Sequence, residues 1–266
     1  HHAGAAGFEV ISLGVEPQPG WIPLCCDFVI LQSSHTDMVM KDYTANQLSD
    51  NNARELLKAL EDQVVDTEVS FYPGAGYHNL MTIRNDPFPD RLLPPDDLIG
   101  EGVRDRMPSG PLAKKLVLVM NQAQIILHNH HFNRKRREEG MDPINSVWFW
   151  GNGDKPSLPS FTEKYTFNAG VVTASSLLRG MAMNAGMKVV PVKGVTGFMD
   201  TDYSAKVSAA VSAMEKLDLV YLQVTAPERP SMQGLVDDKI LAVEDFDREV
   251  VGPILDNFAE QNDVKI

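Results

Sequence analysis

The chain has 266 residues, of which 43% are hydrophobic and 23% are charged. This composition is typical of a folded protein, because disordered chains combine few apolar residues with a high net charge. No apolar run approaches the roughly 20 residues needed to cross a bilayer. The formal net charge is -12, so the overall field repels polyanions and argues against a nucleic-acid-binding role.

The two cysteines, Cys25 and Cys26, are adjacent. Neighbouring cysteines suit neither an ordinary intrachain disulfide nor a zinc site. They predict a reducing, intracellular compartment, with cytoplasm and organelle matrix equally compatible. The chain starts with His1 and His2, without Met and without a signal-peptide pattern, so we expect that a leader was removed or that an upstream segment is absent.

The first half of the chain predicts a small α+β unit. Runs of β-forming residues at 28–32 and 69–72 flank an amphipathic stretch at 53–62, which the polar run Ser49-Asp50-Asn51-Asn52 can cap. Prolines are dense between residues 86 and 111, which excludes a regular helix there. One long helix is predicted for residues 112–139, ending at Gly140.

From residue 146 onward the pattern changes to alternating strands and helices. Strands are predicted at residues 146–150, 170–173, 188–192 and 217–224. Helices are predicted between and after them, at residues 175–184, 204–216 and 237–259. Such alternation is typical of a parallel sheet with flanking helices, so the fold class is α/β.

Two local patterns suggest a functional site, but each also has a simpler structural explanation. His128, His130 and His131 lie near a predicted helix end, but no carboxylate or thiolate partner has ligand spacing, which favours interaction with the helix dipole over a metal site. The glycine-rich segment at residues 151–155 follows a strand as a phosphate loop would. It lacks the spacer of that motif and is followed by Pro156, which favours a tight turn.

Longer motifs carry a resemblance that covers the whole chain. The most distinctive are NSVWFWGNG at residues 145–153 and PSLPSFTEKY at residues 156–165. The shorter ones are FYPGAGY at 71–77, LPPDDL at 93–98, GVTGFMDTDYSAK at 194–206 and VVGPIL at 250–255. In these motifs the chain resembles the archaeal-type, cofactor-independent phosphoglycerate mutases. The resemblance implies an alkaline-phosphatase-like α/β core interrupted by a smaller α+β domain, here residues 7–140, with residues 141–266 in the core.

The resemblance also implies a chemistry that needs two divalent metals, Mn²⁺ or Mg²⁺, and a serine or threonine that carries the phosphoryl group. The nucleophile and the first metal-binding aspartate are expected before His1, and the last ligands after Ile266. The family's internal metal motif falls on residues 225–232, where Glu228 replaces an aspartate and Met232 a histidine. A thioether is a poor ligand for these hard ions, so we expect no metal and no catalytic residue in this chain.

Substrate-contact positions differ in the same way. Arginines of the family correspond to Ala5, Cys25 and His78 here, and a histidine corresponds to Asp96. An aspartate that usually precedes a family helix corresponds to Ser176. His78 and the retained Asp97 are therefore the candidates for a remnant substrate cleft.

Together these features favour a catalytically inactive phosphoglycerate mutase-like subunit, kept for a structural or binding role in a larger assembly. An alternative is an active mutase that interconverts 2- and 3-phosphoglycerate with residues supplied from outside this chain. A small-molecule sensor that binds without turnover is a third. The expected partners are protein subunits or segments of a longer precursor, packed against the strands at Val171 and Val220; neither nucleic acid nor a transmembrane segment is expected.

Overall fold

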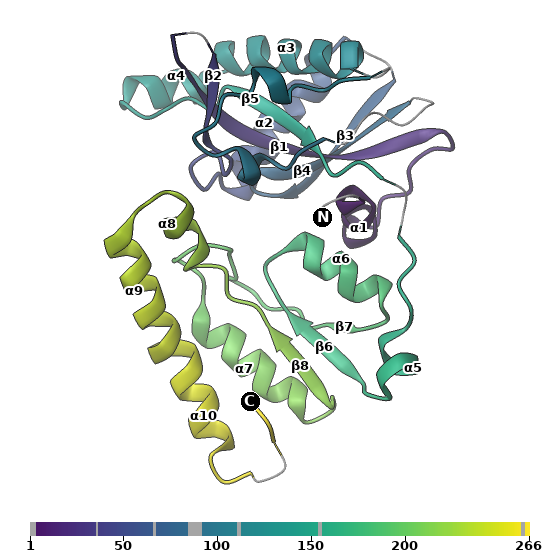
Figure 1. Cartoon of the computed structure of the whole chain (residues 1–266), viewed down its shortest axis with the longest axis vertical. Helices are drawn as coiled ribbons and strands as arrows, with labels where there is room; N and C mark the ends of the chain where they lie inside the picture. Colours follow the sequence, from purple (N-terminus) through teal and green to yellow (C-terminus); the bar gives the residue numbers. More distant parts are fainter. Residues whose placement is uncertain are drawn as a thin grey trace. The chain divides into compact units, whose positions relative to one another are not determined.

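The computed structural model describes residues 4–35, 37–65, 68–84, 92–110, 113–153, 156–261 and 264–266. His1 and His2, at the start of the chain, lie outside the described residues. The chain forms two compact units, His1–Pro156 and Ser157–Ile266 (Figure 1). Each unit is a mixture of helices and strands, which confirms the predicted mixed α/β composition.

Unit 1 is built on an antiparallel sheet (Figure 1). Its strands are β1 (Trp21–Ser33), β2 (Met38–Asp42), β3 (Val69–Ala75), β4 (His78–Arg84) and β5 (Ser146–Trp150). The strands follow the order β2-β1-β4-β3, and β5 also pairs with β1. Ten consecutive residues of β1 are buried, which makes this strand the centre of the unit's core. The strands predicted at residues 28–32, 69–72 and 146–150 are all present.

Helices cover both faces of this sheet. They are α1 (Ala5–Leu13), α2 (Asp50–Gln63), α3 (Ala113–Asn129) and α4 (His131–Glu138), with short 3-10 turns η1 (Pro95–Leu98) and η2 (Arg104–Arg106). Figure 1 shows α2 and α3 on one face and α1 on the other. Ser49 caps α2 by accepting a hydrogen bond from the Asn52 N–H, as predicted.

The single helix predicted for residues 112–139 is wrong. The chain leaves the helical conformation at His130, whose φ of -67° and ψ of 138° are extended, and α4 starts at the next residue. Asn133 stabilises the break, because its buried side-chain amide donates to the carbonyls of Leu127 and Ile144. Residues 113–139 contain neither proline nor glycine, which is why the sequence pattern did not reveal the break.

Unit 2 contains a parallel three-stranded sheet in the order β7-β6-β8 (Figure 1). Its strands are β6 (Ala169–Val172), β7 (Lys188–Val189) and β8 (Leu219–Leu222). Its helices are α5 (Phe161–Tyr165), α6 (Ser176–Asn184), α7 (Tyr203–Met214), α8 (Glu228–Met232), α9 (Val236–Phe246), the π-helical turn η3 (Asp247–Val251) and α10 (Gly252–Phe258). Both strand pairs are parallel, which confirms the predicted parallel sheet with flanking helices.

Strand β5 does not belong to this parallel sheet. It pairs antiparallel with β1, from Cys25 opposite Trp150 to Val29 opposite Ser146, and so completes unit 1. The first compact unit ends at Pro156. The expected domain boundary near Gly140 stays a prediction. Whether unit 1 is an insertion within a larger core stays a prediction.

No helix among the described residues combines the length and the apolarity needed to cross a membrane. Both cysteines are buried and free.

Candidate functional site

The hairpin of β3 and β4 positions His78 at the centre of unit 1. The motif at residues 71–77 forms the end of β3 and the turn, and Gly76 adopts the left-handed φ of 55° that the turn requires. A Cβ at Gly76 would also lie 2.5 Å from the Leu48 carbonyl oxygen, so a larger residue does not fit. His78 is the first residue of β4 and lies opposite Asp27 of β1.

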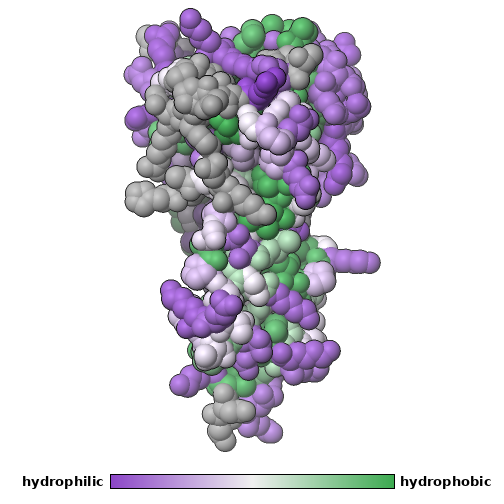
Figure 2. Space-filling model, turned by 90° about the vertical axis from the view of Figure 1, so that its right-hand side faces the viewer, coloured by the Kyte–Doolittle hydropathy of each residue, from purple (hydrophilic) through white to green (hydrophobic). Residues whose placement is uncertain are grey.

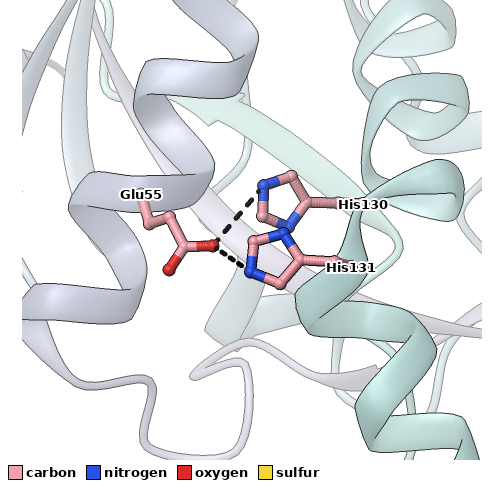
Figure 3. A group of neighbouring side chains, drawn as sticks. All are labelled: Glu55, His130 and His131. Carbon is pink, nitrogen blue, oxygen red and sulfur yellow. Dashed lines mark ion pairs between the residues drawn. The ribbon is translucent and has the colours of Figure 1, made fainter.

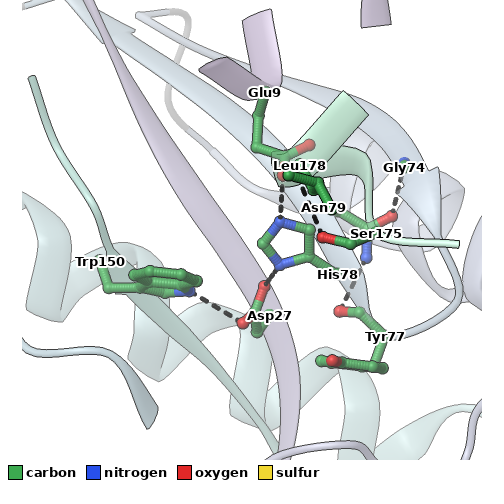
Figure 4. Close-up of polar contacts among 9 residues, drawn as sticks. All are labelled: Glu9, Asp27, Gly74, Tyr77, His78, Asn79, Trp150, Ser175 and Leu178. Carbon is green, nitrogen blue, oxygen red and sulfur yellow. Dashed lines mark hydrogen bonds and ion pairs between the residues drawn. The ribbon is translucent and has the colours of Figure 1, made fainter. Parts of the chain in front are cut away.

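His78 is held between two buried carboxylates (Figure 4). Its Nδ1 lies 2.5 Å from Asp27 Oδ1, and its Nε2 lies 3.0 Å from Glu9 Oε1 of α1. The second oxygen of Asp27 accepts a 2.8 Å hydrogen bond from the indole N–H of Trp150. Glu9 is 1% exposed and Asp27 is 2% exposed, so neither charge is screened by water.

The carboxylates change the protonation of the imidazole. Burial alone would lower the pKa of His78, but the charges of Asp27 and Glu9 and hydrogen bonds with Asp27 and Cys25 raise it well above its ordinary value. Burial also raises the pKa of Asp27, against the lowering effect of His78 and Trp150. The cluster therefore places two buried carboxyl groups against a single imidazole.

The three positions that are expected to correspond to family arginines come together around this cluster. A Cβ placed on Gly151 would lie 2.8 Å from Ala5 Cβ and 3.2 Å from Cys25 Sγ, so both side chains pack against that glycine. Cys25 is also hydrogen-bonded to His78. Burial raises the pKa of the Cys25 thiol to about 12, which keeps it protonated and unreactive as a nucleophile.

Asp97, the other predicted residue of the substrate cleft, is not among the polar contacts that the structure describes for His78. Asp97 is an exposed residue of the 3-10 turn η1, and the polar contacts of His78 within the described residues go to Glu9, Asp27 and Cys25. Gly151 has the left-handed φ of 65° expected of a turn, while Asp154 and Lys155 lie outside the described residues.

Residues 225–232, where the resemblance places the family's metal motif, end in α8 of unit 2. Glu228 is exposed and starts the helix, and Met232, partly buried, ends it. Within the described ranges, no group of three potential metal ligands contains Glu228. Met232 offers only a thioether, and the expectation that this segment holds no metal stays a prediction.

Sequence interpretation missed Glu9 and Asp27, and it assigned all three neighbouring histidines to a helix dipole. Asp27 is the only charged residue in the buried run of β1, and that isolation was an available signal. Only His128 lies in the last turn of a helix, α3. His130 and His131 instead start α4 and meet Glu55 of α2 (Figure 3).

Comparison with known proteins identifies the family. Residues 1–133 match the family model of 2,3-bisphosphoglycerate-independent phosphoglycerate mutase. The chain belongs to this family. A Geobacter sulfurreducens protein named a probable 2,3-bisphosphoglycerate-independent phosphoglycerate mutase is 39% identical over 254 residues, which are 96% of this chain and 64% of that protein.

A Methanosarcina barkeri protein named 2,3-bisphosphoglycerate-independent phosphoglycerate mutase is 35% identical over 96% of this chain and 63% of its own length. The chain therefore spans less than two thirds of either relative. The structure of the PH0037 protein from Pyrococcus horikoshii is similar to this one over 96% of this chain and 60% of the PH0037 chain, with a TM-score of 0.62 and 22% sequence identity. This last similarity concerns the fold alone.

Proposed function

We propose that this phosphoglycerate mutase-like chain is catalytically inactive and serves as a structural or binding subunit of a larger assembly. The observation that carries the proposal is the composition of the cluster around His78. Positions expected to hold three cationic side chains hold Ala5, Cys25 and His78, and the one remaining cation is neutralised by Glu9 and Asp27.

The energetics favour loss of substrate binding. Phosphoglycerate carries a carboxylate and a phosphate, and arginine binds both through paired, charge-assisted hydrogen bonds. Each such contact contributes about 1.5–3 kcal/mol, so losing three would weaken transition-state binding by at least about 10³-fold. The imidazole of His78 is engaged by Glu9 and Asp27, so it is not free to bind an anionic substrate. The exposed Glu228 and the Met232 thioether add support, because neither provides the nitrogen ligand that the metal site needs.

A coupled assay for conversion of 3- to 2-phosphoglycerate tests the inactivity. The natural protein, with any flanking sequence retained, is assayed with Mn²⁺ and with Mg²⁺, and the Methanosarcina barkeri relative is the positive control. We expect kcat/KM at least about 10³-fold below that control, together with no saturable binding of 3-phosphoglycerate by calorimetry. Turnover comparable to the control would support the active alternative and overturn the proposal.

The surface that supports a binding role lies in unit 2. Strand β8 is an edge of the parallel sheet, and its alternate side chains Leu219 and Tyr221 are 39% and 52% exposed. Parallel sheets are ordinarily covered on both faces, so these residues suit contact with another polypeptide. Strand β6 is paired on both sides and Val171 is buried, so we propose the contact at β8, the strand that contains Val220. Figure 2 shows hydrophobic residues among hydrophilic ones on one face of the molecule.

Sedimentation of the natural protein at micromolar concentration tests this second part. We expect an assembly larger than the monomer, and we expect Leu219→Lys with Tyr221→Lys to dissociate it. Leu118→Lys in α3, which is 50% exposed in unit 1, is the matched control and should leave the assembly intact. A monomer that is stable without any partner would contradict the binding role.

A further inference from the structure

A second cluster of polar side chains lies in unit 1, where α2 faces the start of α4 (Figure 3). Glu55 of α2 points toward His130 and His131 at the break between α3 and α4. One ligand atom from each of the three residues lies within 4.8 Å of the others. The cluster is accessible, because the side chains of Glu55 and His131 are 44% and 69% exposed, whereas that of His130 is 12% exposed.

The distances within the cluster match those around a tetrahedral metal ion. Glu55 Oε1 lies 3.0 Å from His131 Nε2 and 3.6 Å from His130 Nε2. Ligand atoms about 2.0–2.2 Å from a tetrahedral zinc ion are about 3.4 Å from one another. The two observed separations bracket that value. The histidine rings lie 4.5 Å apart at 33°, so both can present a nitrogen to the same point.

The donor set indicates the class of ion. Two imidazole nitrogens and one carboxylate oxygen suit Zn²⁺ and its first-row neighbours, whereas Mg²⁺ prefers six oxygen ligands. Three protein ligands leave at least one coordination position for water, as in an open zinc site.

Two features of the cluster limit its affinity. The Nδ1 of His130 accepts a 3.2 Å hydrogen bond from the Phe132 N–H and caps α4, so the neutral ring carries its proton on Nε2. Metal binding at Nε2 requires that proton to leave Nε2 and Nδ1 to take one up, which removes the cap and weakens binding by about five- to tenfold. Arg134 is a nearby positive charge that also opposes a cation.

We propose that Glu55, His130 and His131 form a surface site for a divalent transition-metal ion such as Zn²⁺, separate from the His78 cluster. The sequence pattern alone disfavoured such a site because Glu55 is remote in sequence from the histidines. The fold supplies the missing carboxylate. The inference does not depend on the proposed loss of mutase activity, because no residue is shared between the two clusters.

Calorimetric titration with Zn²⁺, on protein free of chelators and affinity tags, tests the site. We expect saturable binding of Zn²⁺ that a hundredfold excess of Mg²⁺ does not displace. His131→Ala and Glu55→Gln should each weaken it at least tenfold. His128→Ala and Glu61→Gln are the matched controls, since these exposed residues of α3 and α2 lie outside the cluster, and both should bind as the parent protein does.

A comparison of these variants distinguishes Zn²⁺ binding at this site from Zn²⁺ binding at other histidines, including His1 and His2. Circular dichroism of each variant without metal establishes that it is folded, and His131→Gln provides a second, milder test at an exposed position. Absence of saturable Zn²⁺ binding up to millimolar concentration would overturn the proposal. Binding that is unchanged in both His131→Ala and Glu55→Gln would overturn it equally, because the ion would then be held elsewhere.

Discussion

At the scale of single residues, His78 links two buried carboxyl groups of unit 1. It is the common partner of Glu9 and Asp27, which are both almost completely buried. Removing one partner from a buried ion pair leaves an uncompensated charge, which costs more than the intact pair contributes. His78→Leu should therefore lower the free energy of unfolding at pH 7 by about 3–5 kcal/mol, measured by urea denaturation.

The same residue should make stability depend on pH. Because the pKa of His78 is raised in the folded state, its stabilising contribution is complete below the ordinary value of about 6.5 and is lost as pH rises through the folded-state pKa. The stability difference between the parent protein and His78→Leu should consequently narrow as the pH is raised from 7 to 10. A difference that stays constant over this range would show that His78 is not charged in the folded protein.

At the scale of elements, the junction between α3, α4 and β5 is held by one amide. Asn133 is fully buried and donates to the carbonyls of Leu127 and Ile144, while its own oxygen accepts from the Ile144 N–H. This side chain thus ties the end of α3 to the chain entering β5. Asn145 continues the link, because its amide exchanges two hydrogen bonds with the backbone of Leu31 in β1.

Asn133→Ala should destabilise the protein by about 1–3 kcal/mol, the cost of leaving buried backbone groups without partners. Asn129→Ala is the matched control, since that exposed amide donates only to Ile125 one helical turn earlier. We expect it to change stability by less than about 0.5 kcal/mol. Equal effects of the two substitutions in chemical denaturation would mean that the buried bonds do not hold the junction together.

At the scale of the whole molecule, the two units differ in how much they bury. Among the described residues, the largest fully buried side chains come from unit 1, with Lys206 the exception. One core cluster of unit 2 consists of Tyr203, Val207, Ala226 and Val250 with partly buried neighbours. Less apolar burial means a smaller stabilising contribution, so unit 2 should unfold at the lower urea concentration.

The tryptophans allow this to be measured. All three, Trp21, Trp148 and Trp150, lie in unit 1, so their fluorescence reports that unit alone, whereas far-ultraviolet circular dichroism reports both units. We expect the loss of ellipticity to begin at a lower urea concentration than the change in tryptophan fluorescence. Transitions that coincide throughout would instead indicate that the two units unfold cooperatively.

Local patterns were sufficient for most of the elements and for the family. The alternation of Ser146 to Trp150 predicts a strand, and the cap at Ser49 predicts the start of α2, because both depend on neighbours in the sequence. Likewise, the replacement of family arginines at Ala5, Cys25 and His78 is visible without coordinates. These features require no knowledge of which segments meet in space.

Contacts between distant segments were decided only by the tertiary structure. The pairing of β5 with β1 brings Trp150 next to Asp27. The local sequence of neither strand indicates which strand it pairs with. The same holds for Glu9 with His78 and for Glu55 with His131. The sequence shows which side chains can be charged. The electrostatic energy of each charge, however, depends on its burial and on partners less than about 4–6 Å away, and only the folded chain brings those partners together.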